Sequence, residues 1–213
     1  MKFSLYDLLS QILIGFIWLV AIILIWDLHK LEGLLRDVQL ASIPISYALG
    51  YFINTFASWA ENWMFKAWGG KPSRLLIQGN AKSKIRLKRQ ARTHVLLREE
   101  LDLKSDVETP ADVDAMFLIA MSYIGKANNN RIQEFNASYA FSRGMVVTTA
   151  GIAFMLILSI FLENSLNEGR ILFALLSIIA FFISLRRTKE RGYYFAREVL
   201  NNYLREKQPP QSE

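Results

Sequence analysis

Cysteine is absent from this chain of 213 residues, and histidine occurs only twice, as His29 and His94. Without cysteine there is no disulfide framework, no thiolate nucleophile and no thiolate metal site. Two histidines far apart in the sequence also fail to form the ligand clusters that bind zinc. We therefore expect neither a metal nor a cofactor.

Charge is missing from four long runs of the sequence, while hydrophobic residues make up 52% of the whole. A helix needs about 20 apolar residues to cross a hydrocarbon core roughly 30 Å thick. The last run is shorter, but Arg170 and Arg186 flank it and can extend toward the lipid headgroups. We therefore predict an all-α integral membrane protein with four transmembrane helices in a two-plus-two arrangement. The four runs are residues 8–26, 39–60, 144–162 and 171–185.

Positive charge is scarce in two of the segments that connect or flank these runs, namely residues 27–38 and 163–170. The other segments hold 22 of the 25 Lys and Arg residues. Because cytoplasmic segments carry the excess of Lys and Arg, both termini and the long middle segment are predicted to be cytoplasmic. We place the protein in the plasma (inner) membrane as a multi-pass protein. No small-residue cleavage site follows the first run, so we expect a retained helix rather than a signal peptide.

The predicted organisation has four parts. Residues 1–62 form a first transmembrane hairpin and residues 63–143 a basic helical cytoplasmic domain. Residues 144–185 form a second transmembrane hairpin, and residues 186–213 a cytoplasmic C-terminal helix and tail. In the middle part, Gly69, Gly70 and Pro72 end the second helix, whereas Thr109 and Pro110 suit the N-cap and first position of another. Further helices are predicted over residues 85–103 and 111–127, and over 131–142 into the third span.

A block of six basic residues without an acid lies in this middle part. It contains no aromatic side chain that could stack on bases, so we do not expect nucleic acid as a partner. A solvated basic surface beside an anionic membrane leaflet explains its charge. The basic residues are Lys82, Lys84, Arg86, Lys88, Arg89 and Arg92.

Arg89 and His94 have the spacing R-x4-H, which resembles the active-site motif of HEPN ribonucleases. The resemblance implies that Arg89 stabilises charge on a phosphorane and that His94 moves a proton near neutral pH. Any basic helix with one histidine can produce this spacing. We therefore keep the two residues as candidate catalytic groups, although we predict that the protein is not an enzyme.

Small and polar residues recur at spacings of three and four along the second run, so they share one face of a helix. An amide in hydrocarbon seeks a hydrogen-bond partner, and small residues let helices approach closely. The face is therefore predicted to line either a helix interface or a pore, with Glu61 paired to Lys66 or placed at a pore mouth. The residues are Tyr47, Gly50, Asn54, Ser58 and Glu61.

The C-terminal helix carries Phe195, Val199 and Tyr203 in one row, which gives it a broad apolar face. We expect that face to be covered by the protein's own middle segment or by a second copy of the chain. The alternatives are a soluble cytoplasmic partner and the membrane surface.

Four stretches, "FSLYDLLSQILIG", "YALGYFINTFASWAENWMFKAWGGKPS", "NASYAFSRGM" and "GYYFAREVLNNYL", resemble a poorly characterised family of small bacterial four-span inner-membrane proteins. The layout is similar to that of four-span effectors associated with anti-phage defence, which are thought to assemble in the membrane and impair it. That wider group often has Gly-His in the second span, whereas this chain has Gly50-Tyr51. The resemblance implies a bacterial inner membrane and a defence role.

The function predicted from the sequence is a non-enzymatic, homo-oligomeric effector or channel-like subunit that contacts membrane lipids. Two other hypotheses stay open. The first is a membrane-tethered, HEPN-like ribonuclease or RNA-binding protein. The second is a membrane anchor that recruits a soluble partner through the C-terminal helix.

Overall fold

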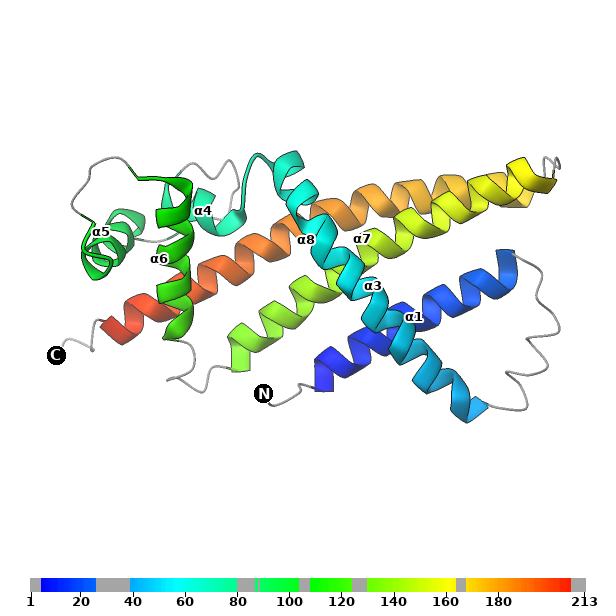
Figure 1. Ribbon diagram of the computed structural model, residues 1–213, viewed down its shortest axis with the longest axis horizontal. Helices are drawn as coiled ribbons and strands as arrows, with labels where there is room; N and C mark the ends of the chain where they lie inside the picture. The colour runs from blue at the N-terminus through cyan, green and yellow to red at the C-terminus, as the bar shows by residue number, and fades with distance from the viewer. Residues whose placement is uncertain are drawn as a thin grey trace. The chain divides into compact units, whose positions relative to one another are not determined.

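A computed structural model describes residues 5–25, 39–79, 87, 89–103, 108–123, 130–163 and 168–207. The described residues form helices and no strand (Figure 1), which confirms the all-α prediction. The helices are α1 (Leu5–Ile25), α3 (Gln39–Trp68), α4 (Pro72–Ile77), α5 (Gln90–Glu100), α6 (Pro110–Ser122), α7 (Asn130–Glu163) and α8 (Glu168–Lys207).

The chain divides into two compact units. Unit 1 comprises Met1–Asn62 and Ala137–Thr188, and unit 2 comprises Trp63–Asn136 and Lys189–Glu213. The sequence placed the corresponding boundaries at residues 143 and 185, where the apolar runs begin and end. The structure places them a few residues away because α7 and α8 each continue as one helix past the end of the apolar run.

Among the described residues, three helices are long and apolar enough to cross a membrane. The candidate spans are Leu8–Ile25 in α1, Arg131–Leu162 in α7 and the helix Glu168–Lys207. Three of the four predicted spans therefore correspond to helices of this kind among the described residues, and the predicted second span does not. The exception is α3, in which Ser46, Asn54 and Ser58 alternate with apolar residues and lower the hydropathy of the run.

Within unit 1, α1 runs parallel to α7. The indole Nε1 of Trp18 donates a hydrogen bond to Thr148 Oγ1 at 3.2 Å. One turn earlier, a Cβ added to Gly144 would lie 2.5 Å from the Ile14 side chain. Toward the other end of both helices, Ile25 and Leu156 belong to one buried apolar cluster. The contacts thus advance in the same direction along both helices.

The helix α3 crosses α1 obliquely and in the opposite direction (Figure 1). Gly15 lies against the backbone of Ser46, and Gly50 against the backbone of Gln11. A Cβ on Gly15 would sit 1.7 Å from the Ser46 carbonyl oxygen, and one on Gly50 would sit 1.9 Å from that of Gln11. Glycine at these two positions is therefore what lets the two backbones approach.

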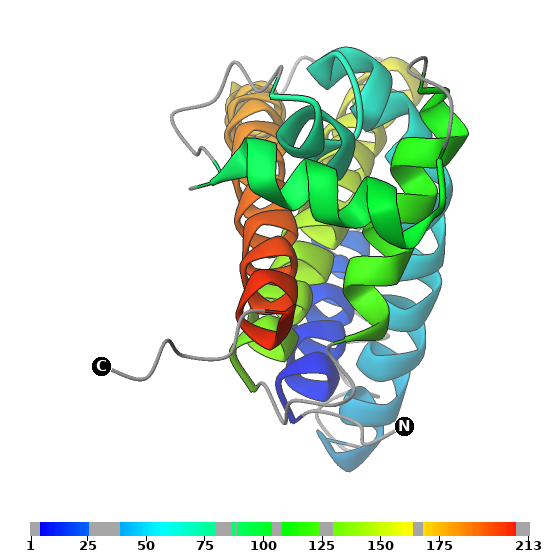
Figure 2. The same ribbon diagram turned by 90° about the vertical axis from the view of Figure 1, so that its left-hand side faces the viewer.

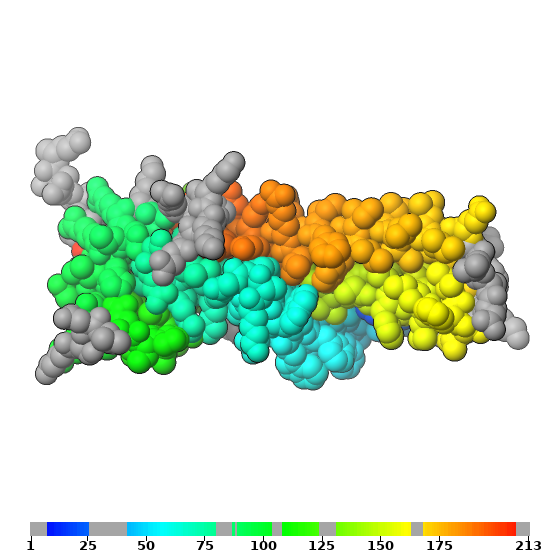
Figure 3. Space-filling view, turned by 90° about the horizontal axis from the view of Figure 1, so that it is seen from above, coloured from blue at the N-terminus to red at the C-terminus, as the bar shows by residue number. Residues whose placement is uncertain are grey.

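The helices α7 and α8 form an antiparallel pair, and their surfaces lie side by side in Figure 3. Leu156 and Ala174 share a buried cluster near the end where α7 passes to α8. The outer face of α8 exposes large apolar side chains such as Leu172, Phe182 and Ile183. That face suits a lipid environment, since it would be costly to leave in water.

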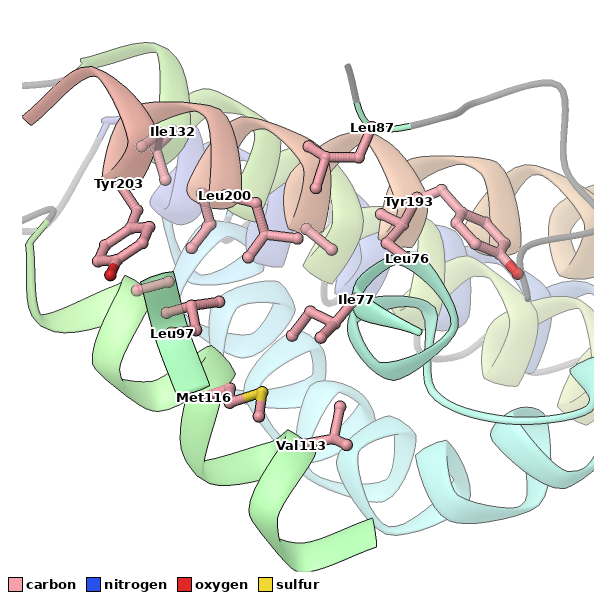
Figure 4. Packing of buried hydrophobic residues seen from close by; sticks show 13 residues of the cluster. Leu76, Ile77, Leu87, Leu97, Val113, Met116, Ile132, Tyr193, Leu200 and Tyr203 are labelled. Atoms are coloured by element: carbon pink, nitrogen blue, oxygen red, sulfur yellow. The ribbon is translucent and has the colours of Figure 1, made fainter. Parts of the chain in front are cut away.

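Unit 2 has its own hydrophobic core, in which α4, α5 and α6 pack against the C-terminal part of α8 (Figures 2 and 4). Leu97, Val113 and Met116 are fully buried there, together with Val199 and Tyr203 of α8. The apolar face of the C-terminal helix is thus covered by the protein's own middle segment, which is one of the coverings expected from the sequence.

The predicted start of α6 is confirmed. Pro110 is its first residue, and the Thr109 hydroxyl accepts a hydrogen bond from the Asp112 backbone N–H while Asp112 accepts from Thr109 in return. The helix predicted over residues 85–103 begins later, at Gln90. Arg89 has φ of 62°, a left-handed conformation that lies outside the α-helical region.

Candidate functional site

The polar face predicted on α3 lies against other helices of unit 1. Gly50 meets α1 at Gln11, and the side chain of Asn54 approaches Gly144 of α7. Tyr47 is half-buried on the same helix. Ser58 is exposed, and its hydroxyl donates to the Asn54 carbonyl oxygen at 3.1 Å.

Glu61 forms the centre of a polar contact between α3 and α7. The Tyr139 hydroxyl donates to Glu61 Oε1 at 2.5 Å, and Arg143 Nη1 lies 3.1 Å from Glu61 Oε2. The Arg143 guanidinium also lies over the Tyr139 ring, 5.7 Å from its centroid. Both carboxylate oxygens therefore have a donor, so we call these three residues the Glu61 lock.

The helical repeat explains why these side chains meet. Asn54 and Glu61 are seven residues apart, which is about two turns of one helix face, and Tyr139 and Arg143 are one turn apart. The sequence suggested Lys66 as a partner for Glu61, but five residues rotate a side chain by about 140° around the helix. Lys66 is exposed, and the structure pairs Glu61 with Arg143 instead.

The lock is only partly shielded from solvent. The Arg143 and Glu61 side chains are 16% and 24% exposed in the isolated chain. An ion pair with this burial is stronger than one on an open surface, since fewer water dipoles screen it. Both carboxylate oxygens are engaged by donors from α7, so the geometry suits holding two helices together.

Four polar side-chain atoms along the contacts among α1, α3 and α7 have no hydrogen-bond partner among the described residues: Gln11 Oε1, Ser46 Oγ, Asn54 Oδ1 and Arg143 Nε. Each such buried group costs about 1–3 kcal/mol unless water or another partner satisfies it. Unsatisfied polar atoms therefore occur both where α3 meets α1 and at the Glu61 lock.

Tyr139 and Arg143 were not among the site residues predicted from the sequence. Arg143 counted only among the Lys and Arg residues of the predicted cytoplasmic segment, residues 63–143. A signal was nevertheless present, because Glu61 and Arg143 are opposite charges that directly follow one apolar run and precede another. Two such charges at the same side of a membrane are natural partners.

The structure does not bring Arg89 and His94 together on one helix. Arg89 precedes α5 in its left-handed conformation and is exposed, whereas His94 lies within α5. The His94 Nε2 atom is 2.8 and 2.9 Å from the two oxygens of Glu108, and Arg98 Nε is 3.8 Å from Glu108. His94 thus has a carboxylate partner that the R-x4-H spacing does not include.

The basic block is described only in part. Arg89 and Arg92 are exposed. The remaining four basic residues, Lys82, Lys84, Arg86 and Lys88, lie outside the described residues.

Glu100 accepts three hydrogen bonds in unit 2. The donors are the Tyr123 hydroxyl at 2.5 Å, the Tyr203 hydroxyl at 2.7 Å and Lys207 Nζ at 3.0 Å. Burial raises the pKa of Glu100, but the hydrogen bonds from Tyr123, Tyr203 and Lys207 outweigh it and hold the pKa below its usual range. The cluster joins the ends of α5, α6 and α8.

Within the part of the chain that the structure describes, no group of three or more acidic or histidine side chains could hold a metal ion. The chain matches no protein-family model, no curated protein and no solved structure.

Proposed function

We propose that the chain is a four-span protein of the bacterial inner membrane and acts there as a membrane-embedded effector or channel-like subunit. The observation that carries this proposal is the Glu61 lock. It is an ion pair between two helices of the unit that contains the candidate spans. Charged residues at such positions are costly and mark functional contacts.

The direction of the helices in unit 1 supports a crossing by α3. Parallel packing with α7 puts the end of α1 near Leu156, at the opposite end of the unit from Tyr139. At Glu61, the chain has returned to the end of unit 1 that contains Tyr139. The described segment that makes this return is α3, whose 30 residues span about 45 Å.

The polar composition of α3 is compatible with this crossing. A tilted helix longer than the hydrocarbon thickness can still span it. Its polar face lies against α1 and α7, and its outer face exposes Phe52, Phe56 and Trp59. An exposed Trp near the end of a span suits the membrane interface.

The lock lies at the point where the membrane helices lead into unit 2. In α3, unit 1 ends at Asn62, the residue after Glu61. In α7, unit 1 begins at Ala137, two residues before Tyr139. Release of the lock would let α3 move relative to α7 and expose the polar face around Asn54. We propose this release as the step that changes membrane permeability.

The other hypotheses draw less support from the geometry. Recruitment of a partner through the C-terminal helix would require the face around Val199 and Tyr203, which is buried in the core of unit 2. A ribonuclease would require Arg89 and His94 to act on one phosphate, whereas His94 is paired with Glu108.

The test is dye leakage from liposomes that contain the purified protein. Glu61→Gln and Arg143→Gln each remove a charged hydrogen bond of about 1.5–3 kcal/mol, so we expect the open population and the leak to rise about tenfold or more. The charge swap Glu61→Arg with Arg143→Glu should return the leak toward the wild-type value. Glu206→Gln is the matched control, because Glu206 is exposed at the end of α8.

Equal leakage from the wild type, the single variants and protein-free liposomes would contradict the proposal, provided that flotation shows the protein to be inserted. Homo-oligomerisation and a role in anti-phage defence, which the resemblance implies, belong to the same proposal. Phage plating on cells that carry the wild type or the Glu61→Gln variant tests the defence role.

A further inference from the structure

The helix α3 has an outer face in unit 1, opposite the side on which Gly50 and Asn54 meet α1 and α7. Figure 1 shows α3 in front of both of these helices, so this outer face is turned toward the viewer. It carries two adjacent rows of side chains, one polar and one aromatic, whose members lie three or four residues apart. The polar row consists of Tyr51, Thr55, Ser58 and Asn62, and the aromatic row of Phe52, Phe56 and Trp59.

Both rows are open to the surroundings of the isolated chain. In the polar row, Thr55 is half-buried and the other three residues are exposed. The residues of the aromatic row are between 54% and 70% exposed. The rings of Phe56 and Trp59 meet edge to face, with 5.2 Å between their centroids. Rings that already pack on each other lose less conformational freedom when another surface covers them.

The polar row is poorly suited to contact with lipid. Tyr51 lies close to the middle of the uncharged run 39–60, so its hydroxyl is deep in the hydrocarbon if α3 crosses a membrane. Tyrosine is instead typical of the membrane interface, where water satisfies the hydroxyl. The Tyr51 hydroxyl has no hydrogen-bond partner among the described residues. Placing it in lipid without one is unfavourable.

The exposed face of α8 has a different chemistry. Between residues 171 and 183, every exposed residue of that helix is leucine, isoleucine or phenylalanine. Such side chains need no partner in lipid, since the lipid tails are equally apolar. Of these two faces, that of α3 combines aromatic rings with hydrogen-bonding groups, as the contact surfaces of proteins do.

We propose that the outer face of α3 binds the same face of a second copy of the chain. This inference rests on the proposed function, because two copies in one membrane have the same orientation and are then related by a two-fold axis along the membrane normal. Equal positions of the two helices therefore face each other. Hydroxyl groups suit such a contact, since each can both donate and accept a hydrogen bond.

The polar row supplies hydrogen bonds for a symmetrical contact. The Thr55 hydroxyl donates to the Tyr51 carbonyl oxygen at 3.0 Å, and the Ser58 hydroxyl donates to the Asn54 carbonyl oxygen at 3.1 Å. Both hydroxyl oxygens keep lone pairs that can accept from another helix. The Tyr51 hydroxyl is the matching donor, so each copy can give one hydrogen bond and receive one.

The area of the face is sufficient for a specific contact. An aromatic side chain buries about 150–250 Å² when it is fully covered. Tyr51 is 56% exposed, and together with the aromatic row it offers about 500 Å². Two copies would then bury about 1,000 Å² in total, which is the size that a specific interface requires.

The experiment is disulfide cross-linking of single-cysteine variants of the full chain in liposomes, since the chain has no cysteine of its own. The test variants are Thr55→Cys and Asn62→Cys, seven residues apart in the polar row. With a membrane-permeant oxidant and little protein per lipid, we expect both to form dimers about tenfold faster than the controls, because pairing raises the effective concentration of the thiols. The matched controls are Leu176→Cys and Ile183→Cys, exposed on α8 at the same spacing.

A second variant tests the hydrogen bonds. Tyr51→Phe keeps the ring and removes the hydroxyl. In the Asn62→Cys background, we expect it to lower the initial rate of dimer formation about five- to tenfold, because two symmetrical hydrogen bonds are lost. The matched control is Tyr194→Phe, which removes the hydroxyl of a half-buried tyrosine in unit 2 and should leave the rate unchanged.

Cross-linking at positions 55 and 62 that is no faster than at positions 176 and 183 would overturn the inference and assign the face to lipid. Equal rates with and without the Tyr51 hydroxyl would overturn it too. Flotation of the same liposomes separates the two claims. A protein that inserts but does not cross-link above the controls contradicts only this inference, whereas a protein that does not insert contradicts the proposed function as well.

Discussion

Glu100 is the residue whose protonation should matter most to unit 2, because its carboxylate accepts from three donors on two other helices. Its pKa in the folded chain is lowered from an ordinary value of 4.5. A carboxyl whose folded pKa is depressed stabilises the folded state fully above its unfolded pKa. That contribution is lost as the pH falls through the folded pKa.

We therefore predict that Glu100→Gln lowers the melting temperature at pH 7, and that the difference from the wild type narrows progressively below about pH 4.5. Thermal unfolding of the full chain in detergent, followed by circular dichroism from pH 7 to pH 3, measures both effects. Glu99→Gln changes the neighbouring exposed acid and should have little effect at any pH. A constant difference between Glu100→Gln and the wild type across the pH range would contradict the prediction.

Glu61 illustrates how far single residues can be predicted. Helical spacing placed Glu61 on the same face as Asn54, and the chemistry of a carboxylate near an apolar run marked it as a residue with a partner. The identity of that partner depends on how α3 packs on α7. The pairing with Arg143 therefore follows from tertiary structure. The spacing between Glu61 and Lys66 in the sequence gives no information about that packing.

The crossing of α1 and α3 provides a prediction at the scale of elements. Alanine is favoured over glycine inside a helix by about 1 kcal/mol, so Gly50→Ala would stabilise α3 in isolation. In the folded chain the new Cβ would lie 1.9 Å from the Gln11 carbonyl oxygen. We expect Gly50→Ala to destabilise the protein by about 1–3 kcal/mol, as overpacking does.

Reversible unfolding in mixed detergent micelles, with helicity as the signal, measures this change. Ala48→Val serves as the control, since Ala48 is exposed on the same helix and also gains volume. If Gly50→Ala proved more stable than the wild type, the close approach of the two backbones would be refuted.

The elements themselves were predicted unevenly. Thr109 and Pro110 gave the start of α6 because a helix cap is encoded locally. The helix predicted over residues 131–142 was expected to continue into the third span, and α7 is indeed one continuous helix. The start of α5 at Gln90 was missed, since the left-handed conformation of Arg89 has no signal in a sequence of basic residues.

At the scale of the whole molecule, the two units follow from packing rather than from hydropathy. Apolar runs mark where a helix can meet lipid, and they set the predicted boundaries at residues 143 and 185. The packing changes elsewhere, at residues 136 and 188, because continuous helices carry side chains of both units. The same limit applies to α3. It is a long helix, but its polar residues lower its hydropathy, and it is not among the candidate spans.

The burial of the C-terminal helix also concerns the whole chain. Val199 and Tyr203 join a core with Leu97 and Met116, which come from the middle segment. These two parts of the sequence are therefore on the same side of any membrane that unit 1 crosses. The distribution of Lys and Arg predicts that this side is the cytoplasm.

The central claim is that α3 crosses the membrane and returns the chain to the side from which α1 starts. Because the chain has no cysteine, each single-cysteine variant carries one thiol. Lys2→Cys, Glu32→Cys, Asn167→Cys and Glu206→Cys can be labelled in intact spheroplasts with a membrane-impermeant maleimide. Labelling at positions 32 and 167, but not at 2 and 206, is the predicted result. Labelling at positions 2 and 167, but not at positions 32 and 206, would show that α3 does not cross and would contradict the account.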